Sequence, residues 1–407
     1  MRLRTVAALV VLLVAFVGVG AVALVTLPGG GSELTELWVS DTPRANEFNH
    51  HGVGATNGVV VAPVTATQGT EGLTRRSCSL NALDPTDGSV QWWTGVRPER
   101  CFSHGLTRPT VADLDGDGTM EIVAGTAENA TVALDADDGR ELFRVPTRAY
   151  GYARPAVADV LGDRTPEIVA SDVSGDAFVA TADGTVRWRG NVSGLVYASP
   201  VATDLDGDGT VEVVVAGRDQ TVAYESNGTV RWRRAVGAND VAVATVDGDA
   251  TVVVAGNQGV VALDGATGDR EWNRSAAGSP AMGALADGDG DGTPEAYVTE
   301  AGSRLRALDA ADGREEWRTR LSTTEGTVTP PAVLADLDGE DEPELVAATN
   351  GGRVTVVDPE TGSERATYER DVAVWTSVTP ANLTTAPGEE MLVRYGDGRV
   401  VALEYGS

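Results

Sequence analysis

The chain has 407 residues, with 60 Asp and Glu against 31 basic residues, and its formal net charge is −29. All 31 basic residues are Arg. A field of this sign repels nucleic acid, so we exclude nucleic acid as a partner. The length allows two or three ordinary domains or one repeat architecture, and the regular recurrence of motifs along the chain favours the repeat.

The amino terminus contains an apolar segment. Residues 5–27 carry no charge, and as a helix they would be about 34 Å long, enough to cross a bilayer. Arg2 and Arg4 precede this segment, so we predict a cytoplasmic stub at 1–4, a membrane anchor at 5–27 and everything that follows outside the cytoplasm. A cleaved signal peptide is the alternative, although its apolar core is usually roughly 7 to 15 residues long. Residues 28–34 are predicted to form a flexible linker, and 35–407 the folded domain.

The exported part contains the two cysteines of the chain, Cys78 and Cys101. An oxidising exterior would allow a disulfide between them, which the chain-entropy model values at about 3 kcal/mol. Two buried free thiols are the alternative. Five Asn-x-Ser/Thr sequons are candidate glycosylation sites: Asn129, Asn191, Asn227, Asn273 and Asn382.

A nine-residue acidic loop occurs three times, each time directly before an apolar run. Positions 1, 3, 5 and 9 are carboxylates, position 7 is a Thr whose carbonyl is available, and the Gly at position 6 permits a sharp bend. Such a set of oxygen ligands suits calcium. The predicted ligands are Asp113, Asp115, Asp117, Thr119 and Glu121 in the first loop, Asp204, Asp206, Asp208, Thr210 and Glu212 in the second, and Asp287, Asp289, Asp291, Thr293 and Glu295 in the third.

Other loops of this kind are degenerate. Asp159, Asp163 and Glu167 remain in one of them, but Leu161 replaces a ligand and Arg164 replaces the Gly, so we predict no calcium there. The loop at Asp247-Gly-Asp249 is shortened. A fourth, incomplete site has Asp341 in place of the Gly; its candidate ligands are Asp336, Asp338, Glu340 and Glu344.

The acidic loops do not follow the EF-hand pattern, which requires Glu at position 12, where this chain has Ala124, Val215 and Val298. Their spacing resembles the FG-GAP calcium loop of integrin alpha-subunit propellers, with Glu in a place where integrins usually carry Asp. The alternative is a set of Asp-Gly turns on an acidic surface, without metal.

A second motif marks the other half of each repeat: Ala-x-Asp, then a Gly turn, then an aromatic residue, as in Ala82, Asp84, Gly88 and Trp92. Residues 108–144 form one such unit and are predicted to contain four antiparallel strands. Units of this kind, recurring about every 40 to 50 residues, are typical of a β-propeller. The aromatic ends of the outer strands are Trp38, Trp92, Phe143, Trp188, Trp232, Trp272, Trp317 and Tyr368.

The last unit, 379–407, lacks an outer strand of its own, whereas the strand around Trp38 has no unit. Joining the two would close the ring and remove an exposed sheet edge. We therefore predict an all-β fold, a single eight-bladed propeller closed by its amino-terminal strand, with seven blades as the alternative.

The Ala-x-Asp, Gly and aromatic motif resembles the repeat of quinoprotein-like (PQQ-type) propellers over nearly all of the chain after residue 35. This resemblance implies either a PQQ-dependent dehydrogenase or a non-catalytic assembly or binding scaffold. The dehydrogenases typically carry an adjacent Cys-Cys pair, which is absent here, and their catalytic Asp cannot be assigned. We expect the repeated Trp residues to pack between blades.

The acid excess and the lack of Lys resemble proteins of salt-loving archaea.

The chain has three histidines, His50, His51 and His104. Neighbouring residues on a strand point to opposite faces, so we do not expect His50 and His51 to share a metal ion and interpret them as solvated loop residues. No nucleophile, phosphate-binding or zinc-protease motif is present.

From the sequence we expect a non-catalytic, membrane-anchored propeller outside the cytoplasm, with calcium in its acidic loops, that binds a protein or glycan partner at the cell surface. A PQQ- and calcium-dependent dehydrogenase is the first alternative. A structural component of the envelope is the second.

Overall fold

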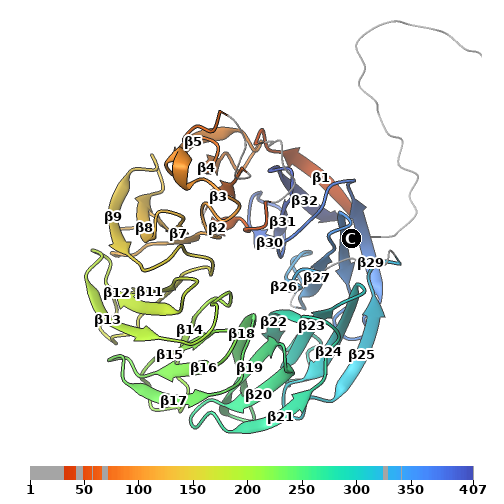
Figure 1. Ribbon diagram of the computed structural model, residues 1–407. Coiled ribbons are helices and arrows are strands. Elements are labelled where there is room, and N and C mark those ends of the chain that lie inside the picture. Colours follow the sequence, from red (N-terminus) through yellow and green to blue (C-terminus); the bar gives the residue numbers. More distant parts are fainter. Residues whose placement is uncertain are drawn as a thin grey trace, which may run out of the picture. The chain divides into compact units, whose positions relative to one another are not determined.

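The computed structural model describes residues 32–42, 49–56, 58–66, 72–323, 329–340 and 342–406. They form eight four-stranded antiparallel sheets that follow one another around an axis (Figure 1). The predicted eight-bladed propeller is confirmed, and the seven-bladed alternative is wrong. The predicted stub 1–4, the membrane anchor 5–27 and residues 28–31 of the linker lie outside the described residues. Within the described part, no helix is long and apolar enough to cross a membrane.

Each blade contains four strands, ordered from the axis outward. The innermost strands are β2 (Gly54–Thr56), β6 (Thr110–Ala112), β10 (Ala156–Ala158), β14 (Val201–Thr203), β18 (Asp240–Val246), β22 (Ala281–Ala286), β26 (Val333–Ala335) and β30 (Thr379–Ala381). We number the blades 1 to 8 in this order. The second strands are β3 (Val59–Val64), β7 (Glu121–Thr126), β11 (Glu167–Ser171), β15 (Glu212–Ala216), β19 (Asp249–Gly256), β23 (Glu295–Glu300), β27 (Glu344–Ala348) and β31 (Glu390–Arg394).

The third strands are β4 (Ser79–Leu83), β8 (Ala130–Asp135), β12 (Asp176–Ala180), β16 (Thr221–Tyr224), β20 (Gly259–Asp264), β24 (Arg304–Asp309), β28 (Arg353–Val357) and β32 (Val400–Gly406). The outer strands are β5 (Val90–Gly95), β9 (Glu141–Pro146), β13 (Val186–Asn191), β17 (Val230–Arg234), β21 (Arg270–Arg274), β25 (Glu315–Arg320), β29 (Glu364–Glu369) and, in blade 8, β1 (Glu33–Val39). The one helix among the described residues is a 3-10 turn, η1 (Pro98–Arg100).

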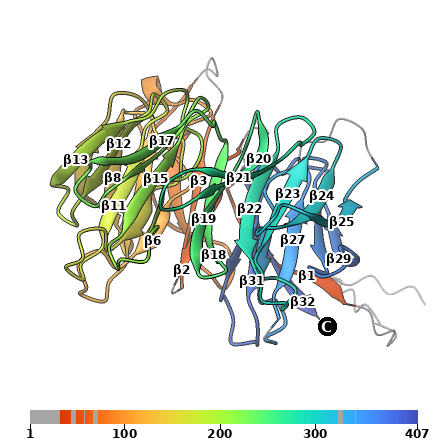
Figure 2. The same cartoon turned by 90° about the horizontal axis from the view of Figure 1, so that it is seen from below.

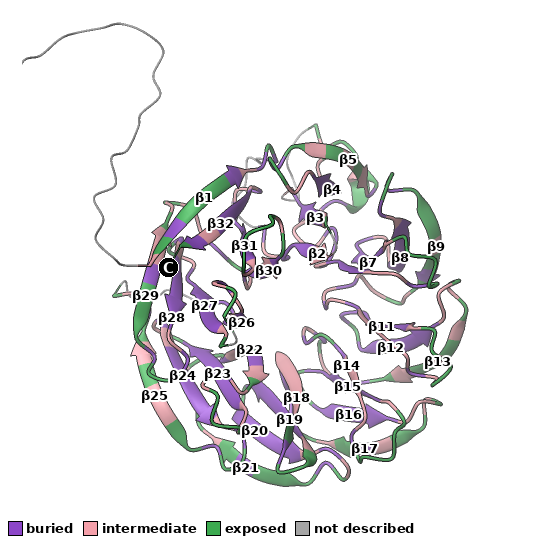
Figure 3. Cartoon of the chain, turned by 180° about the vertical axis from the view of Figure 1, so that it is seen from behind, coloured by how far each residue is buried: buried purple, intermediate pink, exposed green. Residues whose placement is uncertain are grey.

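The core lies between neighbouring blades. Every residue of β7, β11 and β15 is buried, because each sheet packs on a neighbour through both of its faces. These strands are rich in Val and Ile, whose branched side chains fit a pleated surface. The outer strands carry more exposed residues, and β13 alternates between partly buried and exposed residues along its length (Figure 3). Seen from the side, the sheets stand next to one another (Figure 2).

The ring closes as predicted, because β1 pairs antiparallel with β32, with Leu34 opposite Tyr405 and Trp38 opposite Ala402. One boundary of the prediction is wrong: β1 begins at Glu33, so residues 33 and 34 belong to the strand and not to the linker 28–34. Pairing with β32 extends to Glu33 because that residue still lies opposite Gly406.

The outer-strand tryptophans link each blade to the next. In six of them the indole N–H donates a hydrogen bond to a turn carbonyl of the following blade, over 2.6–2.9 Å: Trp38 to Pro85, Trp92 to Ala136, Trp188 to Ser226, Trp232 to Gly265, Trp272 to Ala310 and Trp317 to Pro359. The ring also covers a glycine of the same turn, as Trp92 covers Gly139. The tryptophans therefore pack between blades, as the sequence led us to expect.

The antiparallel order divides the connections between two faces of the ring. The loops between first and second strands, which include the acidic loops, lie on one face, together with the turns that receive the tryptophans. We call it the acidic face. The segments that lead into the innermost strands lie on the opposite face, which we call the top face.

Candidate functional site

The three intact acidic loops of blades 2, 4 and 6 share one local geometry. In the first loop, Asp113 Oδ1 accepts a hydrogen bond from the Gly116 N–H over 2.7 Å, and its Oδ2 accepts one from the Gly118 N–H over 3.0 Å. Both glycines have left-handed backbone angles, φ 78° and 88°. Left-handed glycines therefore stand at positions 4 and 6 of this loop, and the sequence analysis identified only the second. Asp204 and Asp287 make the same pair of bonds.

The Glu at position 9 has a structural role that the sequence did not reveal. In six blades its buried carboxylate accepts a hydrogen bond from the backbone N–H at position 2 of the loop; these residues are Glu121, Glu167, Glu212, Glu295, Glu344 and Glu390. Three of these six, Glu167, Glu344 and Glu390, belong to loops that lack the full set of carboxylates. The Glu therefore fixes the loop to the second strand whether or not the other carboxylates are present.

The carboxylates converge differently in the three loops. In the first, oxygens of Asp113, Asp115 and Glu121 lie within 4.8 Å of one another, and the second loop does the same with Asp204, Asp206 and Glu212. Position 5 does not join these groups: Asp117 and Asp208 each accept bonds from the N–H and hydroxyl of the Thr two residues later.

The third loop brings more carboxylates together. Asp287, Asp289 and Asp291 form one converging group, and Asp289, Glu295 and Glu316 form another. Glu295 is 1% exposed and its Oε1 has no hydrogen-bond partner. Burial, followed by nearby Asp289, raises the pKa of Glu295 to about 7. A buried, unpaired carboxylate oxygen facing other carboxylates fits a bound cation.

A single position on the outer strand sets the charge beside each loop. In each of these blades, one outer-strand residue pairs with an Ala or Val of the third strand, as Phe143 pairs with Ala133. The position in question comes directly before that paired residue. It holds Leu142 in blade 2, Arg231 in blade 4, Glu316 in blade 6 and Arg365 in blade 7. Arg231 forms ion pairs with Asp206 and, over 3.8 Å, with Glu212, so a guanidinium occupies the second loop. Glu316 adds a carboxylate to the third.

The altered loops of blades 3 and 7 differ in whether they keep the bend and the converging carboxylates. Arg164 adopts φ 71° in the place of the missing Gly, so the loop of blade 3 keeps its bend. In blade 7, Arg365 pairs with Glu344 over 2.8 Å, and Asp336, Asp338, Glu340 and Glu344 are absent from the converging carboxylate groups of the described residues. Residue 341 lies outside the described part.

The top face contains a pocket of about 390 Å³ near the axis. Most of its lining comes from segments that lead into the innermost strands of blades 3 to 8 and from the first residues of those strands, and includes Tyr152, Tyr197, Asp240, Pro331 and Trp375. Arg218 comes from the loop between β15 and β16. We call it the axial pocket. Asp240 accepts a hydrogen bond from the Met282 N–H over 3.2 Å, and burial raises the pKa of its carboxyl to about 7. Trp375 is 36% exposed.

The histidines lie on the same face, and the interpretation of them as separate solvated residues is wrong. His50 and His51 precede β2 in an irregular segment, where the alternation of a strand does not apply, and both approach His104, which precedes β6. Ring nitrogens of all three lie within 4.8 Å of one another. Burial, followed by the charges of His50 and His104, lowers the pKa of His51 well below its ordinary value, and burial lowers the pKa of His104 to about 4.

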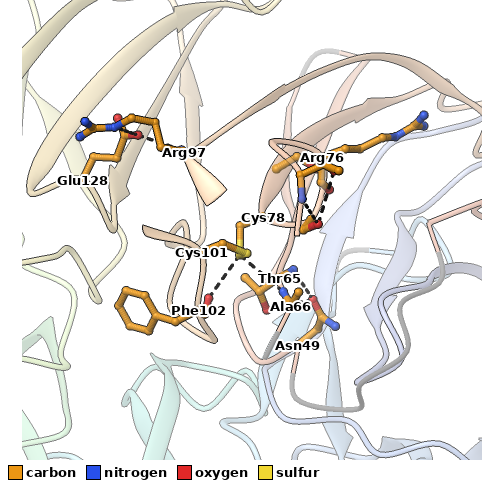
Figure 4. The surroundings of a disulfide bond; sticks show 12 residues. Asn49, Thr65, Ala66, Arg76, Cys78, Arg97, Cys101, Phe102 and Glu128 are labelled. Atoms are coloured by element: carbon orange, nitrogen blue, oxygen red, sulfur yellow. Dashed lines mark hydrogen bonds and ion pairs between the residues drawn. A yellow bond between two sulfur atoms is a disulfide. The ribbon is translucent and has the colours of Figure 1, made fainter. Parts of the chain in front are cut away.

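The two cysteines form a disulfide between the start of the third strand of blade 1 and the segment that leads into blade 2 (Figure 4). Both are buried. A β-carbon on Gly105 would lie 2.9 Å from the Cys78 β-carbon, so the segment that carries His104 packs directly on the bridge.

The five sequons occupy different environments. Asn227, Asn273 and Asn382 are exposed, which leaves their side chains accessible to glycosylation. Asn191 is also exposed, but its amide donates a hydrogen bond to the Gly175 carbonyl over 3.3 Å. Asn129 is partly buried, and its amide donates a hydrogen bond to the Arg148 carbonyl over 3.4 Å.

Comparison with known proteins gives a family match. A family model described as "Outer membrane protein assembly factor BamB" matches residues 76–211, 173–329 and 290–406. The outer membrane protein assembly factor BamB of Bordetella pertussis is 30% identical over 157 residues, which is 37% of this chain and 40% of that protein. The chain thus matches less than half the length of this relative.

Several solved structures are similar in fold, and two of them carry informative names. The crystal structure of BamB from Moraxella catarrhalis has a TM-score of 0.61 at 16% identity, covering 91% of this chain and 97% of the other. Quinohemoprotein alcohol dehydrogenase from Comamonas testosteroni has a TM-score of 0.63 at 12% identity, covering 91% of this chain and 76% of the other. At such identities the similarity concerns the fold alone, which is shared by a protein named as an assembly factor and one named as an enzyme.

Proposed function

Because the chain belongs to the family of β-propellers described as outer membrane protein assembly factor BamB, we propose that it is a non-catalytic scaffold of the cell envelope that binds a protein partner at its top face. The observation that carries this proposal is the axial pocket, to which six blades contribute. A site assembled from many blades presents one continuous surface only when the ring is closed.

The chemistry of the axial pocket suits an inserted peptide loop. Tyr152, Tyr197 and Trp375 provide aromatic surface with polar edges, and prolines provide rigid apolar surface. Asn239 and Ser279, which are hydrogen-bonded to each other over 2.8 Å, offer polar groups for a backbone. Aromatic residues in a partly desolvated pocket are the usual anchors of a protein interface.

Site-specific cross-linking in the cells that make the protein tests this function. A photo-reactive amino acid is placed at Trp375 in the axial pocket and, as a control, at Val230 on the outer strand of blade 4, which is 47% exposed. We expect a discrete protein adduct at position 375 and none at 230. Equal adducts at both positions would contradict the proposal, and adducts at neither would favour a structural component of the envelope.

Calcium forms the second part of the proposal. The third loop fits the ion best, because Asp287, Asp289, Asp291, Glu295 and Glu316 surround it and Glu295 brings an unpaired buried oxygen. A bound ion would offset the repulsion between these carboxylates and stiffen the acidic face. Added calcium should then raise the melting temperature of the wild-type chain by more than that of Asp289→Asn; no rise in the wild type would refute this part.

We further propose that the propeller lies outside the cytoplasm, held by residues 5–27, and is adapted to high salt. The apolar segment, the disulfide and the charge of −29 support this placement and habitat. Molar salt should raise the melting temperature by screening the carboxylates, and an unchanged melting temperature would count against the adaptation.

A PQQ-dependent dehydrogenase is the second candidate, and Asp240 is the observation in its favour. A partly buried carboxyl with a pKa near 7 suits a general base. The fit to PQQ itself is poor, because the cofactor carries three carboxylates and Arg218 is the single cationic side chain in the lining. Dye reduction by the chain in the presence of PQQ, calcium and an alcohol would establish this function in place of the first.

A further inference from the structure

All three histidines of the chain meet at one place on the top face, although the two segments that carry them lie 54 residues apart. We propose that His50, His51 and His104 form a binding site for one divalent transition-metal ion of the zinc type. The inference rests on the positions of their ring nitrogens and does not depend on the proposed function.

The spacing of the nitrogens suits a small ion. His104 Nδ1 lies 3.4 Å from His51 Nε2 and 2.8 Å from His50 Nε2. Two imidazole nitrogens on a tetrahedral zinc ion, at about 2.0–2.1 Å each, are separated by roughly 3.3 Å. The distance of 3.4 Å between His104 Nδ1 and His51 Nε2 is already close to this value. The distance of 2.8 Å between His104 Nδ1 and His50 Nε2 is that of a hydrogen bond, in which one proton joins the two rings. A metal ion would replace that proton and move the two rings apart by a few tenths of an ångström.

The ligand type selects the class of ion. The converging group contains imidazoles and no carboxylate, and neutral imidazole suits zinc, copper, nickel and cobalt, whereas calcium and magnesium require oxygen ligands. The acidic loops and the three histidines, which we call the histidine site, are therefore chemically distinct and lie on opposite faces of the ring.

The first of the two segments is held by buried hydrogen bonds. Asn49 Oδ1 accepts a bond from the Thr65 N–H over 2.8 Å and another from Arg394 over 3.1 Å, and the Asn49 amide donates to the Gly396 carbonyl over 2.8 Å. Asn49 is 1% exposed. The residue directly before His50 thus fixes this segment to blades 1 and 8.

The second segment is held by the disulfide and by blade 2. Cys101 lies three residues before His104, and Gly105 packs on Cys78. The Ala127 N–H donates to the Gly105 carbonyl over 2.9 Å, which fixes the segment from its other side. Both ligand segments are therefore positioned before any ion binds, as a metal site requires.

Three protein ligands leave a fourth position for water or for a group from a partner. The Tyr152 ring lies 5.0 Å from that of His104 and 5.1 Å from that of His51, and Tyr152 also lines the axial pocket. His50 and His104 are partly exposed. An ion at the histidine site would thus be accessible from the top face, next to the pocket.

Cobalt(II) titration tests the proposal, because tetrahedral Co²⁺ absorbs visible light and binds the ligand sets that Zn²⁺ binds. The full chain is prepared without a histidine tag, stripped with chelator and titrated. We expect one Co²⁺ per chain with the absorption of a tetrahedral nitrogen-bound ion, displaced by Zn²⁺. His104→Gln should lower the affinity at least about 100-fold, whereas Asp289→Asn, in the third acidic loop, should leave the spectrum unchanged.

Imidazole NMR of the wild-type chain provides a measurement that needs no variant. The chain has three histidines, so three imidazole spin systems are expected, and all three should shift together on addition of one equivalent of Zn²⁺. Binding that survives in folded His104→Gln, or Zn²⁺ that leaves the imidazole signals of the wild type in place, would overturn the proposal.

Discussion

Trp38 and Gly88 join the two ends of the ring. A β-carbon on Gly88 would lie 2.4 Å from Trp38 Cε3, and Trp38 Nε1 donates a hydrogen bond to the Pro85 carbonyl of the same turn over 2.8 Å. Because β1 is the outer strand of blade 8 and Gly88 belongs to blade 1, this contact connects the first strand of the chain to the first complete blade and fixes the closure.

We predict that Gly88→Ala lowers the free energy of unfolding by about 3 kcal/mol, since it adds a steric clash to an unfavourable left-handed backbone. Gly302→Ala is the matched control: φ there is +82° but nothing lies within 4 Å of the added carbon, so we expect a loss of about 1 kcal/mol. Chemical denaturation measures both. Equal losses would show that the contact with Trp38 contributes nothing.

We predict that the outer-strand residue sets calcium affinity. Glu316→Gln should weaken binding at the third loop about tenfold by removing a ligand charge, and Arg231→Leu should strengthen binding at the second loop about tenfold by removing a competing cation. Calorimetry would be performed on chains in which the first Asp of the other two loops is replaced by Asn. Leu142→Ala at the equivalent position of blade 2 is the control and should change nothing. If the second loop of Arg231→Leu bound calcium no more tightly than that of the parent chain, this explanation would be contradicted.

The disulfide should act on both stability and the histidine site. Replacing Cys78 and Cys101 together by Ser should lower the free energy of unfolding by about 3 kcal/mol, because it releases a constraint between residues 23 apart in the sequence. The same variant keeps all three histidines but loosens the segment of His104, so Co²⁺ affinity should fall less than in His104→Gln. An unchanged Co²⁺ affinity would show that the bridge does not position His104.

Asp240 should make stability depend on pH. Burial raises the pKa of its carboxyl from 3.8 to about 7, so between these values the folded chain binds a proton that the unfolded chain has lost. The free energy of unfolding contributed by this group therefore falls as pH rises from about 4 to about 7. Asp240→Asn removes this contribution, so the wild type should lose stability relative to the variant between pH 5 and pH 8. Parallel stability curves would refute the raised pKa.

Much of the fold followed from local sequence patterns. The hairpins, the acidic loops and the aromatic ends of the outer strands each lie within a few residues, and the orphan strand around Trp38 together with the incomplete last unit predicted the closure by β1 and β32. Backbone direction alternates with every antiparallel strand, so a unit of four strands can be recognised without knowing what it packs against.

The candidate sites depended on contacts that no local pattern records. Arg231 and Glu316 occupy the same place beside their loops, but the sequence separates each from its loop by two strands, and the loops themselves have the same pattern. His50 and His51 lie in an irregular segment before β2, where side chains do not alternate as they do in a strand. The segment held by the disulfide places His104 next to them. The sequence alone therefore determined the repeated unit and favoured eight copies over seven, because the unit arises from short-range geometry. Only the tertiary structure decided which charges and ring nitrogens meet, because those contacts form between strands and blades whose side-chain directions are set by packing.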